Sequence, residues 1–132
     1  MRILFDTNVL VSAFLVFKRG SMCYDIIDHA VESHELYYTN FIIAEFKKVF
    51  REDFDYPETV INEYVAFITR FFIKGETAET TEKICRDSKD DQVLSDAVNN
   101  DIEVIITGDK DLLVLKKHKG IKIISPQDYW KL

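Results

Sequence analysis

Acidic side chains occur at four separated points of the chain, each just beyond an apolar run or early in the helix that follows it. They are Asp6, Glu45, Asp91 and Asp109. Ligand sites in open α/β sheets form outside the carboxyl ends of the strands, so we expect these carboxylates to converge. Carboxylates that are crowded together repel each other unless a proton or a cation neutralises them. The pattern therefore predicts a site for a divalent metal ion.

Two of these acids are expected to face inward. Glu45 has Phe41 and Val49 at helical spacing on either side, which places it on or beside an apolar stripe. Asp91 is in phase with Leu94 in the same way. An ionised carboxylate that faces the core costs several kcal/mol unless it is paired or bound to a metal. The direction of these two side chains therefore favours a functional role.

Helix capping is the alternative explanation for the other acids. Asp6 and Asp109 could each accept hydrogen bonds from free backbone amides at the start of a helix. Ser88 and Asp91 have the spacing of a variant capping box. Capping explains any one of these three acids as well as catalysis does. It explains less well why four acids, two of them directed inward, should coincide.

The elements that must position these acids alternate between short apolar runs and helical stretches, which is typical of βαβ units. Strands are expected at residues 2–5, 36–38, 103–106 and 121–124, with a weaker one at 76–80. Helices are expected at 7–17, 20–33, 40–51 and 57–74, and again from residues 88 and 110. At 132 residues the chain fits a single α/β domain, residues 1–132.

Composition excludes several classes of protein. The hydrophobic fraction of 47% is ordinary for a globular protein, and no apolar run is long enough to span a membrane. Cys23 and Cys85 lack the spacing of a disulfide framework or a zinc site, and they suit the reducing cytoplasm. The net charge of -6 argues mildly against a protein that grips nucleic acid by its overall field. The three histidines lie outside the acidic motifs and are expected at the surface.

Three segments taken together carry a family resemblance. Residues 5–13 (FDTNVLVSA), 85–94 (CRDSKDDQVL) and 106–113 (ITGDKDLL) resemble the motifs of the PIN domain, particularly of its toxins in toxin–antitoxin pairs. The closing residues 124–129 (ISPQDY) are also similar to the usual ending of that branch, so the resemblance spans essentially the whole chain. It implies a three-layer α/β/α fold with about five parallel strands, and cleavage of RNA that depends on Mg²⁺ or Mn²⁺.

The resemblance also implies which residues act. By motif position, the family's acids fall on the same four positions, with Thr7 and Thr107 as polar companions. Val93 departs from the family, which often has a bulkier aromatic there. Asp90 beside Asp91 leaves the third acid open by one residue, and we choose Asp91 because Leu94 and Val98 share its phase.

The expected chemistry follows from these residue types. Hard cations prefer oxygen ligands, and Mg²⁺ is commonly held by a few carboxylates while it keeps several waters. A metal held in this way lowers the pKa of bound water and so supplies a hydroxide for in-line hydrolysis of a phosphodiester. The sequence thus predicts an endoribonuclease that needs no histidine as its base.

Two other functions remain open. One is a PIN-like module that binds RNA or a protein without cutting. The other is a receiver-type signalling domain, which needs adjacent acids after its first strand and a lysine after its last. Here the first strand is followed by Asp6 alone and the last by Ser125, which argues against a receiver.

The helix expected at residues 57–74 suggests partners. Its apolar residues cover more of the circumference than the roughly 100° that one core-facing side needs. They are Val60, Ile61, Tyr64, Val65, Phe67, Ile68, Phe71 and Phe72. Neighbouring helices of the same chain could bury both sides. Alternatively this surface, with Phe50 and Phe54 nearby, forms a homodimer or receives a segment of a cognate antitoxin.

Overall fold

The computed structural model describes residues 1–16, 19–79 and 81–132. This part of the chain contains a six-stranded sheet with the order β3-β2-β1-β4-β6-β5. The strands are β1 (Arg2–Phe5), β2 (Glu35–Tyr38), β3 (Ile73–Lys74), β4 (Val104–Ile106), β5 (Lys117–His118) and β6 (Ile121–Ile124). Neighbouring strands pair in parallel, except that β5 runs antiparallel to β6 at one edge. The α/β fold with a mostly parallel sheet is as predicted from the sequence.

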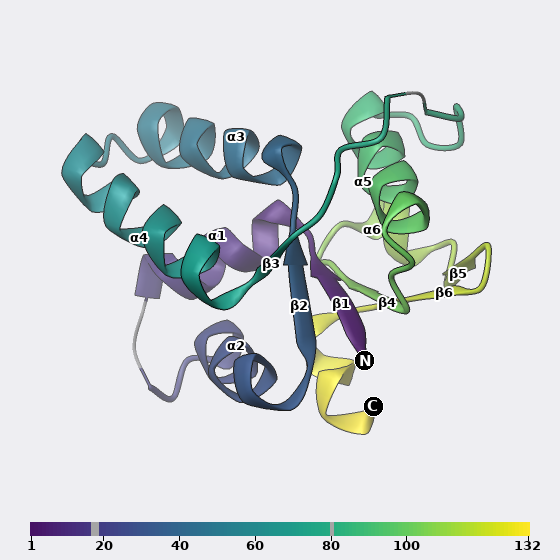
Figure 1. The fold of residues 1–132 in the computed structure, drawn as a ribbon, viewed down its shortest axis with the longest axis horizontal. Coiled ribbons are helices and arrows are strands. Elements are labelled where there is room, and N and C mark those ends of the chain that lie inside the picture. Colours follow the sequence, from purple (N-terminus) through teal and green to yellow (C-terminus); the bar gives the residue numbers. More distant parts are fainter. Residues whose placement is uncertain (17–18, 80) are drawn as a thin grey trace.

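The helices surround this sheet. They are α1 (Thr7–Val16), α2 (Met22–Ser33), α3 (Asn40–Lys48), α4 (Glu58–Phe71), α5 (Ser88–Asn99) and α6 (Lys110–Leu113). A π-helical turn, Val49–Asp53, extends α3, and a 3-10 helix, Pro126–Lys131, ends the chain. In Figure 1, α1 to α4 lie to the left of β1 and β2, and α5 and α6 lie to the right. None of the helices described is both long and apolar enough to cross a membrane.

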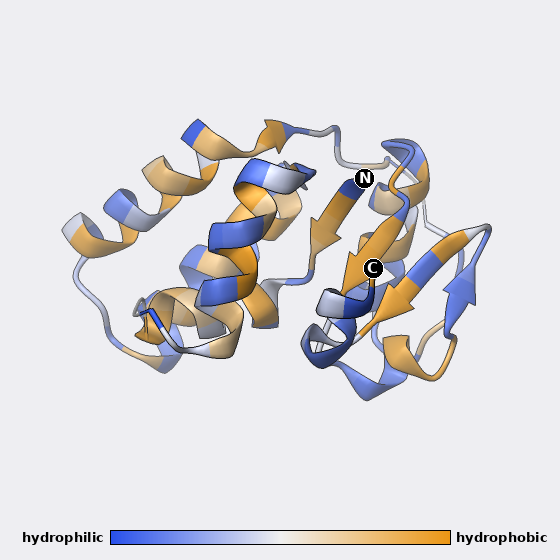
Figure 2. Ribbon diagram, turned by 90° about the horizontal axis from the view of Figure 1, so that it is seen from below, coloured by the Kyte–Doolittle hydropathy of each residue, from blue (hydrophilic) through white to orange (hydrophobic). Residues whose placement is uncertain are grey.

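The central strands are apolar on both faces because helices cover them. Ile3, Leu4 and Phe5 are buried, and so are all three residues of β4. Continuous apolar runs of this kind are typical of parallel strands between two layers of helices, and Figure 2 shows these strands largely in the hydrophobic colour. The register pairs Phe5 with Ile106. The residues that follow the two strands therefore emerge side by side.

An aromatic cluster fixes α3 against α1 and α4. The ring of Phe46 lies 5.6 Å from that of Phe14 and 4.9 Å from that of Phe50. The ring of Phe50 lies 5.5 Å from that of Tyr64 on α4. Aromatic pairs at such distances each contribute about 0.5–1.5 kcal/mol beyond the area they bury. Their packing holds in place the helix that carries Glu45.

Two expected boundaries differ from the structure. The helix predicted at residues 57–74 ends at Phe71, and Ile73–Lys74 form β3, so the weak strand predicted at 76–80 lies elsewhere. Residues 76–79 form no strand, while Thr80 falls outside the described residues, as does Phe17 at the predicted end of the first helix. The cause is tertiary: Gly75 N donates to Tyr38 O at 2.7 Å, and this pairing with β2 replaces the last helical turn.

Candidate metal centre

Asp6 follows β1 and is held by donors from the residues that come after β1 and β4. Its Oδ1 accepts from Thr7 N at 2.8 Å, and its Oδ2 accepts from the Thr107 hydroxyl at 2.7 Å. Asn8 Nδ2 also donates to Oδ2, at 3.4 Å. Burial raises the pKa of Asp6, and the hydrogen bonds from Thr107 and Thr7 oppose that rise. Thr107 thus acts through its side chain, whereas the contact from Thr7 is made by its backbone.

Asp109 lies beyond β4 and serves as the N-cap of α6. Its Oδ1 accepts from Asp111 N at 2.9 Å, and its backbone N donates to Thr107 Oγ1 at 3.0 Å. The capping role considered for this residue is therefore present. Asp109 nevertheless lines the same pocket as Asp6, so that capping fixes the carboxylate at the site. Thr107 joins the two acids, because it donates to one and accepts from the backbone of the other.

The third acid in this pocket is Asp90, and the placement predicted for Asp91 is wrong. Both Asp90 and Asp91 are among the buried residues of α5, but only Asp90 lines the pocket. Val98, which supported the choice of Asp91, is 39% exposed. The helical phase that pairs Asp91 with Val98 therefore does not describe the side of α5 that faces the acids.

Asp91 is buried outside the acidic pocket and has a structural role. Its Oδ1 accepts from Ile84 N at 3.0 Å and from Cys85 N at 2.8 Å. These backbone hydrogen bonds lower the pKa of Asp91. The capping box considered for Ser88 and Asp91 is also absent, because Asp87 is the N-cap and accepts from Lys89 N at 2.9 Å.

Glu45 reaches the pocket from α3, as predicted. Its carboxylate, 21% exposed, forms an ion pair with Lys89, whose Nζ lies 3.2 Å from Oε2. Both side chains line a cavity of about 450 Å³ together with Asp6, Asp90 and Asp109. Four acids thus converge from β1, α3, α5 and the end of β4.

Asp90 has the environment that best fits a cation. Its Oδ2 is buried and has no hydrogen-bond partner among the described residues. One carboxylate oxygen each from Asp90, Asp109 and Asp111 lie within 4.8 Å of one another. Burial, followed by the charge of Asp109, raises the pKa of Asp90 to about 7. A buried oxygen without a donor, close to other carboxylates, accommodates either a proton or a hard metal ion.

Three further residues at the site were not assigned roles from the sequence. Asn8 accepts from Gly108 N at 3.1 Å and so joins the loops after β1 and β4. Asp111 enters the acidic cluster from the first turn of α6, and Lys89 pairs with Glu45. Asn8 and Asp111 both lie two residues after a predicted ligand. That proximity is the feature of the sequence that could have assigned them to the site.

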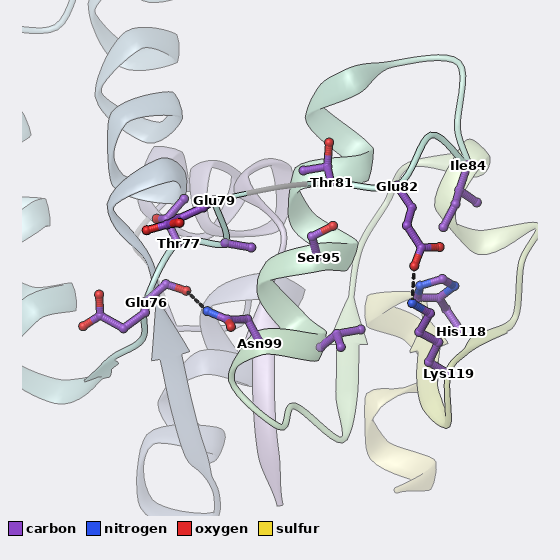
Figure 3. Close-up of a pocket in the computed structure, with 12 residues that line it drawn as sticks. Glu76, Thr77, Glu79, Thr81, Glu82, Ile84, Ser95, Asn99, His118 and Lys119 are labelled. Atoms are coloured by element: carbon purple, nitrogen blue, oxygen red, sulfur yellow. Dashed lines mark hydrogen bonds and ion pairs between the residues drawn. The ribbon is translucent and has the colours of Figure 1, made fainter.

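A second, larger hollow of about 680 Å³ has a different character. It lies between residues 76–79 and 81–84, α5 and the turn between β5 and β6, and it shares no lining residue with the acidic pocket. Figure 3 shows Asn99 donating to the Glu76 carbonyl oxygen on one side and Lys119 paired with Glu82 on the other. Its lining includes Glu79 as well, so negative charge predominates. This charge does not suit a phosphate-bearing ligand.

Comparisons with known proteins agree with the fold described above. The model of the PIN domain matches residues 2–111, whereas no curated protein matches the sequence. The structure of VapBC2 from Rickettsia felis, bound to a DNA fragment from its promoter, aligns with a TM-score of 0.70 and 9% identity, over 95% of this chain and 98% of that one.

A second similar structure is VapC20 of Mycobacterium tuberculosis, a toxin that cleaves the sarcin–ricin loop. It aligns with a TM-score of 0.61 and 8% identity, over 91% of this chain and 98% of that one. At such low identity, both structures support the fold alone. The family match covers the two central strands and all the acids of the pocket, and the chain belongs to the PIN domain family.

Proposed function

We propose that this protein is an endoribonuclease that depends on Mg²⁺ or Mn²⁺. The observation that carries this proposal is the buried, unpartnered Oδ2 of Asp90 in a pocket that it shares with five other acids, among them Asp6, Glu45 and Asp109. Asp6, Glu45, Asp90 and Asp109 line this pocket and would hold the metal. Asp111 belongs with Asp90 and Asp109 to the group of closely spaced carboxylate oxygens. Membership of the PIN family rules out the receiver-type alternative.

The chain's own residues orient the ligands. Thr107 fixes Oδ2 of Asp6, and the Asp111 amide fixes Oδ1 of Asp109. Preorganisation of this kind keeps the carboxylates in place without a cost at the moment of binding. A bound divalent ion supplies an acidified water and neutralises charge on the scissile phosphate. No histidine lines the pocket in the described part of the chain, which is consistent with chemistry that uses carboxylates alone.

The proposed biological role is that of a toxin with a cognate protein antitoxin. This role is proposed by analogy with the two similar structures, of which one is a toxin that cleaves the sarcin–ricin loop and the other is VapBC2. We therefore propose RNA as the substrate and an antitoxin as the partner. A module of this fold that binds RNA without cutting it is the outcome against which activity must be tested.

The test is a pair of variants at adjacent positions. Purified protein should cleave single-stranded RNA with Mn²⁺, and EDTA should abolish cleavage. Asp90→Asn should lower kcat/KM by about a hundredfold or more, because it removes a metal ligand. Asp91→Asn should stay close to the wild type, because an amide oxygen can still accept from Ile84 and Cys85. Rates on a fluorescent oligonucleotide measure both.

The two variants have the same chemical change one residue apart, so each serves as the control for the other. Loss of activity in Asp91→Asn with a normal rate in Asp90→Asn would reverse our assignment of the ligand. Wild-type protein that binds RNA in Mn²⁺ but leaves it intact would identify a silent binding module.

A further inference from the structure

Lys89 is the single cationic side chain among the described residues that line the acidic pocket. The acids there are Asp6, Glu45, Asp53, Asp87, Asp90 and Asp109. The Lys89 ammonium lies 3.2 Å from Oε2 of Glu45, and this contact raises the pKa of Lys89. A cation of the chain itself thus pairs with one of the carboxylates proposed to hold the metal.

The backbone of Lys89 is fixed, whereas its side chain is free to exchange partners. Lys89 N donates to Oδ1 of Asp87 at the start of α5, which places the residue directly before Asp90. Its side chain is 51% exposed. Ion pairs at this exposure are worth about 0–1 kcal/mol, so a divalent ion with several oxygen ligands can replace the ammonium group at Glu45.

The displaced ammonium group would remain at the edge of the pocket. A lysine is a point charge on a flexible stem and binds phosphate oxygens without demanding a fixed geometry. RNA that approaches this site meets acids on most sides, and Lys89 offers a local attraction that the net charge of -6 does not. A phosphate beside the scissile bond is the group of the substrate that suits it.

We propose that Lys89 is an exchangeable counter-cation: it pairs with Glu45 in the metal-free protein, yields Glu45 to the metal, and then binds a phosphate of the RNA backbone. This inference rests on the proposed function. It assigns Lys89 a positioning role, in which the metal and the substrate bind in a coupled order.

The test compares Lys89→Met with Lys131→Met. Lys131 also pairs with a carboxylate at 3.2 Å, that of Asp128, but it lies in the C-terminal 3-10 helix outside the pocket. Each variant therefore loses one positive charge and one ion pair of equal length. Isothermal titration of the metal-free protein with Mn²⁺ should show that Lys89→Met binds up to about fivefold more tightly than the wild type. Lys131→Met should match the wild type.

Cleavage kinetics at saturating Mn²⁺ test the second step of the proposal, in which Lys89 binds a phosphate of the RNA. Lys89→Met should raise KM for RNA with a smaller effect on kcat, and the dependence of log KM on log salt should lose about one unit of slope. Lys89→Arg should restore both the KM and the slope, because it keeps the charge.

The outcomes separate this inference from the function on which it rests. Wild-type protein that binds no Mn²⁺ would contradict the proposed function itself. Wild-type protein that binds Mn²⁺ and cleaves RNA, with unchanged or weaker Mn²⁺ binding by Lys89→Met, would overturn the role of Lys89 alone. An unchanged KM and salt slope in Lys89→Met would overturn it as well.

Discussion

Asp90 and Asp91 are adjacent and both buried, but their pKa values are shifted in opposite directions. Burial, followed by the charge of nearby carboxylates, raises the pKa of Asp90 to about 7. Backbone N–H groups that donate to Asp91 lower its pKa. At Asp91 the donated hydrogen bonds outweigh the effect of burial on the pKa, whereas at Asp90 the nearby carboxylates add to that effect. Of these two neighbouring acids, Asp90 is thus free to bind a ligand, whereas Asp91 binds the backbone of the loop before α5.

The raised pKa of Asp90 predicts how stability depends on pH. In the unfolded chain this carboxyl titrates near its ordinary value, so between about pH 4 and pH 7 the native state binds more protons. Its contribution to the free energy of unfolding therefore falls as the pH rises through that window. Asp90→Asn removes this loss, so the variant's stability relative to the wild type should increase from about pH 5 to about pH 8.

Urea denaturation with EDTA at both pH values measures this difference. Asp128→Asn, which changes an exposed acid of the C-terminal helix, is the control and should show no such trend. A difference between Asp90→Asn and the wild type that stays constant with pH would mean that Asp90 titrates at its ordinary value.

At the scale of residues, the position of an acid after a strand proved more informative than its phase in a helix. Asp6 and Asp109 were placed from the ends of two strands, and the structure puts them in one pocket. Glu45 was placed correctly by apolar neighbours at full helical turns. The same argument failed to choose between Asp90 and Asp91, because both are buried on α5 and only Asp90 lines the pocket.

At the scale of elements, a buried carboxylate joins α5 to the start of α3. Asp96 Oδ2 accepts from the hydroxyl of Thr39, the N-cap of α3, at 3.2 Å. Its Oδ1 accepts from Ala78 N at 2.7 Å and from Gln92 Nε2 at 2.8 Å. Asp96 thus connects the helix of Glu45, the helix of Asp90 and the segment that follows β3.

Removal of this carboxylate should be costly. Asp96→Ala leaves a buried donor on Thr39 and a partly buried one on Ala78 without a partner, and we expect a loss of about 3 kcal/mol in the free energy of unfolding. Thr39→Ala, which loses a cap and one hydrogen bond, should cost about 1 kcal/mol. Chemical denaturation ranks the two variants. Equal losses would mean that the bond to Ala78 contributes little.

The short elements at the edges of the sheet could not be predicted from periodicity. β5 has two residues, and its turn depends on positive φ angles of 48° at Lys119 and 82° at Gly120. Two-residue hairpin turns need such angles. β3 is equally short, and its pairing with β2 is a tertiary effect that no local pattern encodes.

At the scale of the whole molecule, large apolar side chains remain at the surface around α4. Phe54 is 45% exposed, Phe71 is 44% exposed and Ile73 is 41% exposed. Ile61 and Ile68 of α4 are buried, so other helices of the chain cover part of its apolar surface but not all of it. We propose that the apolar surface around α4 that stays exposed forms the contact of a homodimer.

Light scattering at high micromolar concentration should then give the mass of a dimer. Phe71→Lys should shift the mass toward the monomer of 15.5 kDa without a change in fold, because a charge would be buried in the contact. Lys74→Met, at the same edge, changes the charge without removing apolar area and should remain dimeric. A strictly monomeric wild-type protein would rule out the homodimer.

The backbone ladder of the sheet continues past β1 and β4 into the site, since Asp6 N donates to Ile106 O and Thr107 N donates to Ile124 O. Asp6 and the threonine that joins it to Asp109 therefore move only with the core strands. Glu45 and Lys89 arrive on helices and meet through side chains alone. The side of the site formed by Asp6 and Thr107 is therefore held by the sheet, whereas the side formed by Glu45 and Lys89 can rearrange. Amide exchange at Asp6 and Thr107 should stay slow when metal and RNA bind and change the contacts of Glu45 and Lys89.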